Sequence, residues 1–319
     1  MEGELKALRD AIDAVDAQLV ELLHRRAALA QDVGKLKHAA DAPVYRPERE
    51  AEVLRRVAAA GRGPLAPTVV QSIFREVISA CRALERPLAV AYLGPAGTFS
   101  ELAMLRQFGS RVQGEPCPSV EEVFRATESG RTEFSVVAVE NSTEGAVNRP
   151  LDLLLATPLR ILAEVSVPVR HHLLTRSGKL DGVRRVMAHP QALAQCIGWL
   201  NRHAPALERL PAASNAEAAR LAGGDPTIAA IAGERAAGHF DLQSVAENIQ
   251  DEPLNRTRFL VLGRQDTSPS GRDFRLAVEL LRHRVQPREI EATLAALGRH
   301  RWDTNYARRT VRAAMRGAA

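Results

Sequence analysis

Residues 2–38 read EGELKALRDAIDAVDAQLVELLHRRAALAQDVGKLKH, a stretch with no proline and only two glycines. Its aliphatic residues recur in steps of three and four, at Leu5, Leu8, Ile12, Val15, Leu19, Leu22, Leu29, Val33 and Leu36. This period predicts one long helix with a coiled-coil-like seam, which would be about 50 Å long at the usual helical rise. A small helical domain cannot cover so long a stripe by itself. We therefore expect a second copy of the chain to bury the seam, which makes a homodimer.

The seam has one gap, at position 26, where an arginine stands. A buried guanidinium needs an anionic partner because an unpaired buried charge is costly. Arg26 could form a salt bridge with another helix, or it could bind a small anion. Lys37 lies about 20° around the helix and about 16 Å away, so the two long cationic side chains could converge on a dianion. Arg9 lies about 260° around the helix from Arg26, as expected if it serves the partner's site.

Two shorter helices are expected to follow. The first begins at Pro47, because proline suits the first helical position, and ends at a Gly/Pro loop over residues 61–67. The second covers about residues 68–86, and Pro87 stops it. Glu85 closes an otherwise apolar row of residues on this helix, so a carboxyl group stands at the end of a buried stripe.

These charged positions resemble the small all-helical chorismate mutases over residues 5–86, including the stretches VGKLK and VYRPERE. The positions that carry the resemblance are Arg9, Arg26, Lys37, Arg49, Glu50 and Glu85. It implies that Arg26 and the partner's Arg9 hold the two carboxylates of chorismate, while Glu50 holds the ring hydroxyl. Lys37 and Glu85 would contact the ether oxygen, and Arg49 would line the site. A pericyclic rearrangement needs only a held conformer and cations where negative charge grows.

From Leu88 onward, short apolar runs alternate with helical stretches. The expected strands are residues 88–93, 134–139, 161–169, 185–188, 227–232 and 258–262. This alternation is typical of an α/β fold, and we expect largely parallel strands. Ser119 with Glu122, and Ser214 with Glu217, have the spacing of capping boxes and predict two helix starts.

Four clusters stand at strand ends or between elements, where open α/β sheets place their sites. They are GPAGTFS at 94–100, ENSTEG at 140–145, VRHHLL at 169–174 and NRTRFL at 255–260. Each also has an ordinary structural interpretation, as a strand–helix turn, an Asx or Ser/Thr turn, or a buried histidine. The first could receive an anion at a helix N-terminus, and the last offers a hydroxyl between two guanidinium groups.

The order of GPAGTFS, ENSTEG, HHLL, AHPQALAQC, SNAEAA and NRTRF resembles the prephenate dehydratases across residues 88–263. The resemblance implies two lobes similar in shape to type II periplasmic binding proteins, with substrate in the cleft. It implies that Thr257 is the main catalytic group and Arg258 a partner of a substrate carboxylate. The residues implied to line the cleft are Thr98, Ser100, Asn141, Ser142, Thr143 and His171. Prephenate loses CO2 and its ring hydroxyl, so the Thr257 hydroxyl could assist the departing hydroxide.

The composition of the sequence argues against several other classes of protein. The sequence has no apolar run long enough to span a membrane and no signal peptide at its start. Its three scattered cysteines have no metal-ligand spacing, which favours the cytoplasm and argues against a structural zinc. No nucleotide fingerprint is present, so we expect no metal and no cofactor. The net charge of +5 comes from the C-terminal stretch, so nucleic acid is not the expected partner.

The resemblance to the dehydratases fails from Gln265. Enzymes of this family usually continue into an ACT domain that binds phenylalanine, but its Pro-Gly-Ala-Leu-type and Glu-Ser-Arg-Pro-type marks are absent after Gly263. We therefore expect phenylalanine to inhibit the protein weakly or not at all. We expect a mutase domain at 1–86, a dehydratase domain at 87–264, and an irregular or helical linker and tail at 265–319.

Together the two resemblances imply a bifunctional enzyme of phenylalanine biosynthesis that converts chorismate to prephenate and prephenate to phenylpyruvate. One alternative is a ligand-sensing module built on the dehydratase-like cleft, which would keep anion contacts but would not need Thr257. Another is a helical dimerisation module with an inactive first domain, which would not place Arg26 on the seam.

Overall fold

The computed structural model describes residues 1–39 and 45–264, and the described residues divide into two compact units. Unit 1 comprises Met1–Leu88 and the short segment Phe108–Gln113. Unit 2 comprises Ala89–Gln107 and the described residues from Gly114 on. The tail expected at residues 265–319 lies outside the described residues. Within the described ranges, no helix combines the length and the apolar character that a membrane span requires.

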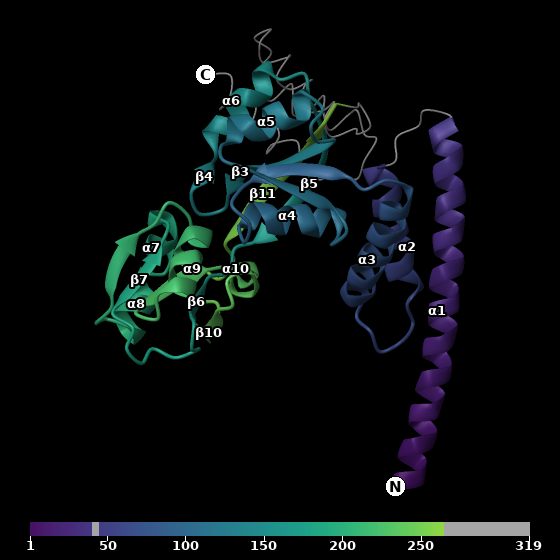
Figure 1. Ribbon diagram of the computed structural model, residues 1–319, viewed down its shortest axis with the longest axis horizontal. Coiled ribbons are helices and arrows are strands. Elements are labelled where there is room, and N and C mark those ends of the chain that lie inside the picture. The colour runs from purple at the N-terminus through teal and green to yellow at the C-terminus, as the bar shows by residue number, and fades with distance from the viewer. Residues whose placement is uncertain (40–44, 265–319) are drawn as a thin grey trace, which may run out of the picture. The chain divides into compact units, whose positions relative to one another are not determined.

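Unit 1 contains three helices (Figure 1), which are α1 (Glu2–Ala39), α2 (Pro47–Ala60) and α3 (Pro67–Glu85). The long helix predicted from the period is confirmed as one unbroken α1, and Pro47 and Pro67 occupy the first turns of α2 and α3. Helix α3 packs against both α1 and α2. The nine aliphatic side chains of the α1 seam remain 48–72% exposed. One chain therefore leaves the seam uncovered.

Unit 2 contains two β-sheets. The first has the strand order β2–β1–β3–β11–β5, with β4 paired to β3. Its strands are β1 (Ala89–Leu93), β2 (Gln113–Cys117), β3 (Phe134–Asn141), β4 (Gly145–Ala146), β5 (Arg160–Pro168) and β11 (Arg256–Gly263). The helices that accompany it are α4 (Phe99–Phe108), α5 (Val120–Glu128) and α6 (Asn148–Ala156). Helices α5 and α6 share one hydrophobic core with β1, β3 and β11, to which Phe124, Leu151 and Leu260 contribute.

The second sheet has the strand order β10–β6–β9–β7–β8. Its strands are β6 (His172–Thr175), β7 (Arg185–Ala188), β8 (Glu208–Pro211), β9 (Ile228–Ala232) and β10 (Gln243–Ala246). The helices are α7 (Pro190–Gln195), α8 (Ile197–His203), α9 (Asn215–Gly224) and α10 (Glu234–His239). One core lies against α7 and α8, and another lies against α9 and α10. Leu173 belongs to the first core and its neighbour Leu174 to the second, as alternation along a strand requires.

Both sheets are mixed, and the expectation of largely parallel strands holds for β1, β3 and β5 in the first sheet and for β7, β8 and β9 in the second, but not for β11. Strand β1 is parallel to β3, but β11 runs antiparallel to both β3 and β5. In the second sheet β7 is parallel to β8 and β9, whereas β6 is antiparallel to β9 and β10. The path of the chain explains the difference. The chain leaves the first sheet after β5, builds the second sheet, and returns as β11 between strands that are already in place.

Two chain segments connect the sheets, residues 169–171 and residues 247–255. The segments lie side by side, because the Val169 N–H donates to the Asn255 carbonyl at 2.9 Å and the Ile249 N–H donates to the His171 carbonyl at 2.8 Å. The double connection therefore fixes His171 and Asn255 next to the start of β11.

Both predicted helix starts are confirmed, each with the serine half of its capping box. The Ser119 hydroxyl accepts from the Glu122 N–H at 3.2 Å, and the Ser214 hydroxyl accepts from the Glu217 N–H at 3.0 Å. These bonds start α5 and α9 at the predicted positions.

A substitution of Leu262 tests whether β11 is a central strand, because the Leu262 side chain is fully buried in the core against α5 and α6. We expect Leu262→Ala to lower the free energy of unfolding by about 2–5 kcal/mol, since the lost methyl groups leave a cavity. Leu254→Ala is the control, because Leu254 is 82% exposed, and it should change stability by less than about 0.5 kcal/mol. Urea unfolding followed by circular dichroism measures both. Equal effects of the two substitutions would contradict the position given to β11.

Candidate active sites

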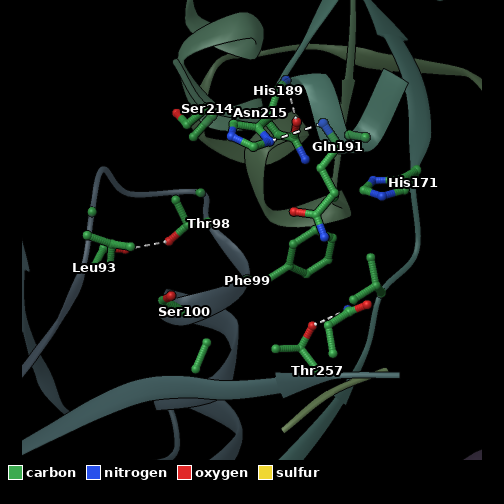
Figure 2. A pocket seen from close by; sticks show the side chains of 18 of the residues that line it. Leu93, Thr98, Phe99, Ser100, His171, His189, Gln191, Ser214, Asn215 and Thr257 are labelled. Atoms are coloured by element: carbon green, nitrogen blue, oxygen red, sulfur yellow. Dashed lines mark hydrogen bonds between the residues drawn. The ribbon is translucent and has the colours of Figure 1, made fainter. Parts of the chain in front are cut away.

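Unit 2 contains a cavity of about 480 Å³, lined by strands of the first sheet and by helices and connecting segments that accompany both sheets (Figure 2). Strands β3 and β11 contribute Asn141 and Thr257, and His171 comes from the connection between the sheets. The start of α4 contributes Thr98 and Ser100. In Figure 2 these two side chains lie across the cavity from those of the second sheet's helices, which are His189, Gln191, Ser214 and Asn215.

The hydrogen bonds of Asn141 fix the role of the Thr257 hydroxyl. Asn141 Oδ1 accepts from the backbone N–H groups of Thr143 at 3.0 Å and Glu144 at 3.1 Å. Because a backbone N–H can only donate, these bonds determine which end of the amide is the oxygen. Asn141 Nδ2 therefore donates, to Thr257 Oγ1 at 2.9 Å and to Asn255 Oδ1 at 3.0 Å. The Thr257 oxygen thus accepts a hydrogen bond and keeps its own proton for another acceptor.

His171 is a neutral, buried member of the cavity wall. Only 2% of its surface is exposed, and burial lowers its pKa, although the hydrogen bond to Gln195 acts in the opposite direction. Gln195 Nε2 donates to the Glu144 carboxylate at 3.4 Å, so Gln195 Oε1 accepts from His171 Nε2 at 2.9 Å. His171 Nδ1 is then the unprotonated nitrogen. It is buried and has no hydrogen-bond partner within the described residues, so its capacity to accept a hydrogen bond is unsatisfied in this structure.

The cavity offers helix N-termini to an anion rather than cationic side chains. Among the described residues that line it, none is a lysine or arginine. Helices α4 and α9 start at its wall, where Thr98 accepts from the Glu101 N–H at 3.3 Å and Ser214 caps α9. Backbone N–H groups and the helix dipole at such ends favour carboxylates. Gly97 has a φ of +87°, and a Cβ there would lie 3.2 Å from Ala236 Cα, so glycine allows the loop before α4 to approach α10.

Five of the residues that the resemblance implied for the cleft or for catalysis do line the cavity. They are Thr98, Ser100, Asn141, His171 and Thr257. Ser142 and Thr143 instead lie in the turn after β3, outside the cavity lining. The Ser142 hydroxyl accepts from the Arg256 N–H at 2.9 Å and donates to Asn255 Oδ1 at 3.3 Å. The hydrogen bonds of these two residues therefore help to order Asn141 and Asn255.

Arg258 departs from its expected position. Its guanidinium group donates to Glu140 at 3.0 Å and to Glu164 at 3.1 Å. Side chains alternate along a strand, and because Thr257 and Phe259 line the cavity, Arg258 faces the other side of the sheet. The structure therefore does not bring Arg258 to a substrate carboxylate, in contrast to the prediction.

Sequence reasoning gave no role to several polar residues that line the cavity. Gln191 and Gln195 belong to the motif AHPQALAQC, and Asn215 belongs to SNAEAA. Asn215 Oδ1 accepts from the His189 N–H at 2.9 Å, which connects the starts of α7 and α9. The available signal was the position of these amides, because each stands in the first turns after a strand, where ligands bind in such folds.

Unit 1 brings together three of the residues implied for the mutase. Lys37 on α1 donates to Glu85 on α3 at 3.2 Å. Glu50 on α2 is paired with Arg82 of α3, and the charge of Lys37 also acts on it. Burial raises the pKa of Glu50, and the nearby cations Arg82, Lys37 and Arg75 oppose this rise. Two acids and a lysine from three helices therefore face one region.

The three other positions implied for the mutase do not converge in a single chain. Arg26 is half-buried on α1. The Arg49 side chain is 57% exposed and pairs with Glu52 on its own helix at 2.9 Å. Arg9 is exposed. The roles of these arginines stay predictions.

Comparison with known proteins gives the family. Residues 8–86 match the family model of chorismate mutase type II, and residues 90–267 match that of prephenate dehydratase. A bifunctional chorismate mutase/prephenate dehydratase of Pseudomonas aeruginosa is 47% identical over 278 residues, covering 85% of this chain and 76% of the relative. A Neisseria gonorrhoeae relative of the same name is 48% identical over 268 residues, covering 83% and 74%.

A solved structure extends the comparison to the fold. Prephenate dehydratase from Arthrobacter aurescens, in complex with L-Phe, matches with a TM-score of 0.51 and 33% identity over 56% of this chain and 61% of that chain. Both sequence resemblances are confirmed at the level of family, and the dehydratase resemblance also at the level of fold. The chain belongs to the bifunctional chorismate mutase/prephenate dehydratases, which convert chorismate to prephenate and prephenate to phenylpyruvate.

Proposed function

We propose that prephenate is converted in the cavity of unit 2, with Thr257 as the catalytic hydroxyl, and that chorismate rearranges in a separate site built on Lys37, Glu50 and Glu85. The observation that carries the first assignment is the hydrogen bond from Asn141 Nδ2 to Thr257 Oγ1 at 2.9 Å. It leaves the Thr257 proton available to a leaving group. The mutase domain then corresponds to residues 1–86 and the dehydratase domain to residues 87–264.

The dehydratase reaction needs a proton donor at the ring hydroxyl. The bond between the ring and its carboxylate breaks, and its electron pair moves into the ring and expels hydroxide. In this proposal the Thr257 hydroxyl donates to the departing oxygen, which leaves as water, and solvent restores the proton. The starts of α4 and α9 hold the side-chain carboxylate through backbone N–H groups. Neutral His171 offers Nδ1 as an acceptor in the same cavity.

The mutase reaction needs held charges rather than a reacting side chain. Lys37, fixed by Glu85 at 3.2 Å, meets the ether oxygen of chorismate, where negative charge develops as the bond breaks. Glu50 accepts a hydrogen bond from the ring hydroxyl. Arg26, Arg49 and Arg9 of the partner subunit complete the site around the carboxylates in this proposal.

The homodimer follows from the exposed seam of α1, whose aliphatic residues a second α1 would bury. The same arrangement supplies Arg9 to the neighbouring site. The three cysteines are free and buried, which supports a cytoplasmic location for the protein.

The first test separates the two activities. Thr257→Val keeps the shape of the side chain but removes the hydroxyl, so we expect kcat for phenylpyruvate formation from supplied prephenate to fall by about 100-fold or more. Chorismate consumption should stay unchanged, because Thr257 lies in the other unit. Thr257→Ser keeps the hydroxyl and should retain much of the activity. Normal turnover by Thr257→Val would instead favour a ligand-sensing cavity with chemistry elsewhere.

The second test addresses the direction of the hydrogen bond at Thr257. Asn141→Asp replaces the Nδ2 donor by an oxygen, so the Thr257 hydroxyl would have to donate to the introduced carboxylate and could no longer donate to the substrate. We expect kcat to fall by about 10- to 100-fold with a smaller change in KM. Asn255→Asp is the control, because it keeps the acceptor oxygen that Asn141 contacts. A change in KM alone would remove Asn141 from the catalytic step.

The third test asks whether two chains share a mutase site. Arg9→Ala and Arg26→Ala should each abolish mutase activity on their own. Unfolded together and refolded in equal amounts, they should recover about a quarter of the wild-type activity, because about half of the dimers are mixed and each of those has one intact site. Refolding each variant alone is the control. A mixture no more active than its components would place both arginines in one chain's site, or in none.

A further inference from the structure

Helix α3 presents one row of residues that the mutase resemblance does not use. The row consists of Glu76, Ser79 and Arg82, spaced three apart and therefore on one face. All three contact the segment Phe108–Gln113, which belongs to unit 1 although β1 and most of α4 precede it in the chain.

Backbone contacts hold this segment against α3. Glu76 accepts from the Ser110 N–H at 3.2 Å, and the Ser79 hydroxyl accepts from the Arg111 N–H at 3.1 Å. Gly109 has a φ of +75°, and a Cβ there would overlap the Cβ of Ser79. Only glycine allows so close an approach. The segment is therefore fitted to α3 rather than resting loosely on it.

Arg82 joins the segment to helix α2. Arg82 is only 6% exposed, and its guanidinium group donates to the Glu50 carboxylate and to the Phe108 carbonyl. The same group lies over the rings of Tyr45 and Phe108, 5.4 Å and 5.9 Å from their centroids. The two rings contact each other with centroids 4.9 Å apart. The fork of the guanidinium is thus held between two aromatic rings, a carbonyl and a carboxylate.

We infer that Arg82 is a positioning residue of the chorismate mutase, which with the Phe108 carbonyl orients the Glu50 carboxylate toward the ring hydroxyl of the substrate. The inference rests on the proposed role of Glu50. Arg82 engages Glu50 Oε1, so Oε2 is the oxygen left for the hydroxyl. A planar, buried guanidinium fixes the direction of a carboxylate better than a flexible ammonium group does.

The charge of Arg82 has a second effect on Glu50. An ionised carboxylate accepts hydrogen bonds with both oxygens, whereas protonation turns one oxygen into a donor. Because Arg82 engages Oε1, the proton would go to Oε2, the oxygen left for the ring hydroxyl. Burial raises the pKa of Glu50, and three cations face it, Arg82 and Arg75 from α3 and Lys37 from α1, with Arg82 opposing the rise most strongly. Without Arg82, the pKa of Glu50 rises further. As the pH is lowered, Glu50 therefore becomes protonated earlier, at a higher pH, than in the wild type.

A double-mutant cycle in the full chain tests the inference. Arg82→Leu should lower mutase kcat/KM by about 10- to 100-fold, as expected when a hydrogen-bonded charged group loses its partner. Glu50→Gln should also lower it by about 10-fold or more. In the double variant, Arg82→Leu should add less than about a twofold loss, because its effect passes through Glu50. Arg82→Lys keeps the charge and should recover part of the activity.

The pH profile separates positioning from a purely structural effect. The acid-side fall of mutase kcat/KM should move to higher pH in Arg82→Leu, stay near the wild-type position in Arg82→Lys, and disappear in Glu50→Gln. Phenylpyruvate formation from supplied prephenate is the internal control and should be unchanged in all variants. Circular dichroism and gel filtration check folding, and if Arg82→Leu does not fold, Arg82→Lys and Glu50→Gln carry the cycle.

Two kinds of result would overturn the inference, and they have different meanings. Full mutase activity in Glu50→Gln would refute the proposed role of Glu50 and the inference with it. Two outcomes would refute the role of Arg82 alone, both with an impaired Glu50→Gln variant. In the first, Arg82→Leu is fully active. In the second, the losses of Arg82→Leu and Glu50→Gln add in the double variant, and the pH profile of Arg82→Leu does not move.

Discussion

The return of β11 between β3 and β5 is the constraint on which unit 2 depends. This strand pairs with both neighbours along its whole length, and its buried residues fill the core against α5 and α6. The pairing also sets the chemistry, because Thr257 lies opposite Asn141 in the register. A slip of one residue would place Arg258 in the cavity and Thr257 on the opposite face. One set of backbone hydrogen bonds therefore fixes both the fold and the position of the proposed catalytic hydroxyl.

In unit 1 the corresponding constraint is the length of α1. A straight helix of 38 residues offers more apolar surface than α2 and α3 can cover, and the seam stays exposed in one chain. The part of α1 that packs on α3 carries Lys37 to Glu85. The uncovered part carries Arg9 and a half-buried Arg26. The same excess of length on which the proposed dimer rests thus distributes the cations over a larger surface than one chain encloses.

The sequence predicted the elements whose pattern is local. The long period of α1, the prolines that start α2 and α3, and the two serine caps are each written in a few neighbouring residues, and all are confirmed. Strands β2, β8 and β10 were missed because they are sheet edges that bury few apolar side chains. The antiparallel direction of β11 was missed because it follows from the path of the chain through the second sheet. The sequence motifs identified Thr98, Ser100, Asn141, His171 and Thr257 of the cavity lining. In the motif ENSTEG, Ser142 and Thr143 have hydrogen bonds that order Asn141 and Asn255.

The arginines show most clearly what a sequence cannot tell. Arg258 and Arg82 each have carboxylate partners that no local pattern reveals, and Arg49 pairs with Glu52 one turn along its own helix, so a cation in a motif is not yet a cation available to a substrate. The consequence differs between the two reactions. A guanidinium paired with the ring carboxylate of prephenate would stabilise the ground state from which CO2 must leave, and would oppose decarboxylation. The described lining of the cavity proposed for this reaction has no lysine or arginine that could pair with the ring carboxylate. The side-chain carboxylate, which is not lost, is assigned in the proposal to helix N-termini, which bind it with partial charges only. Chorismate keeps both of its carboxylates during rearrangement. A mutase site can therefore hold them with full positive charges without any loss of rate.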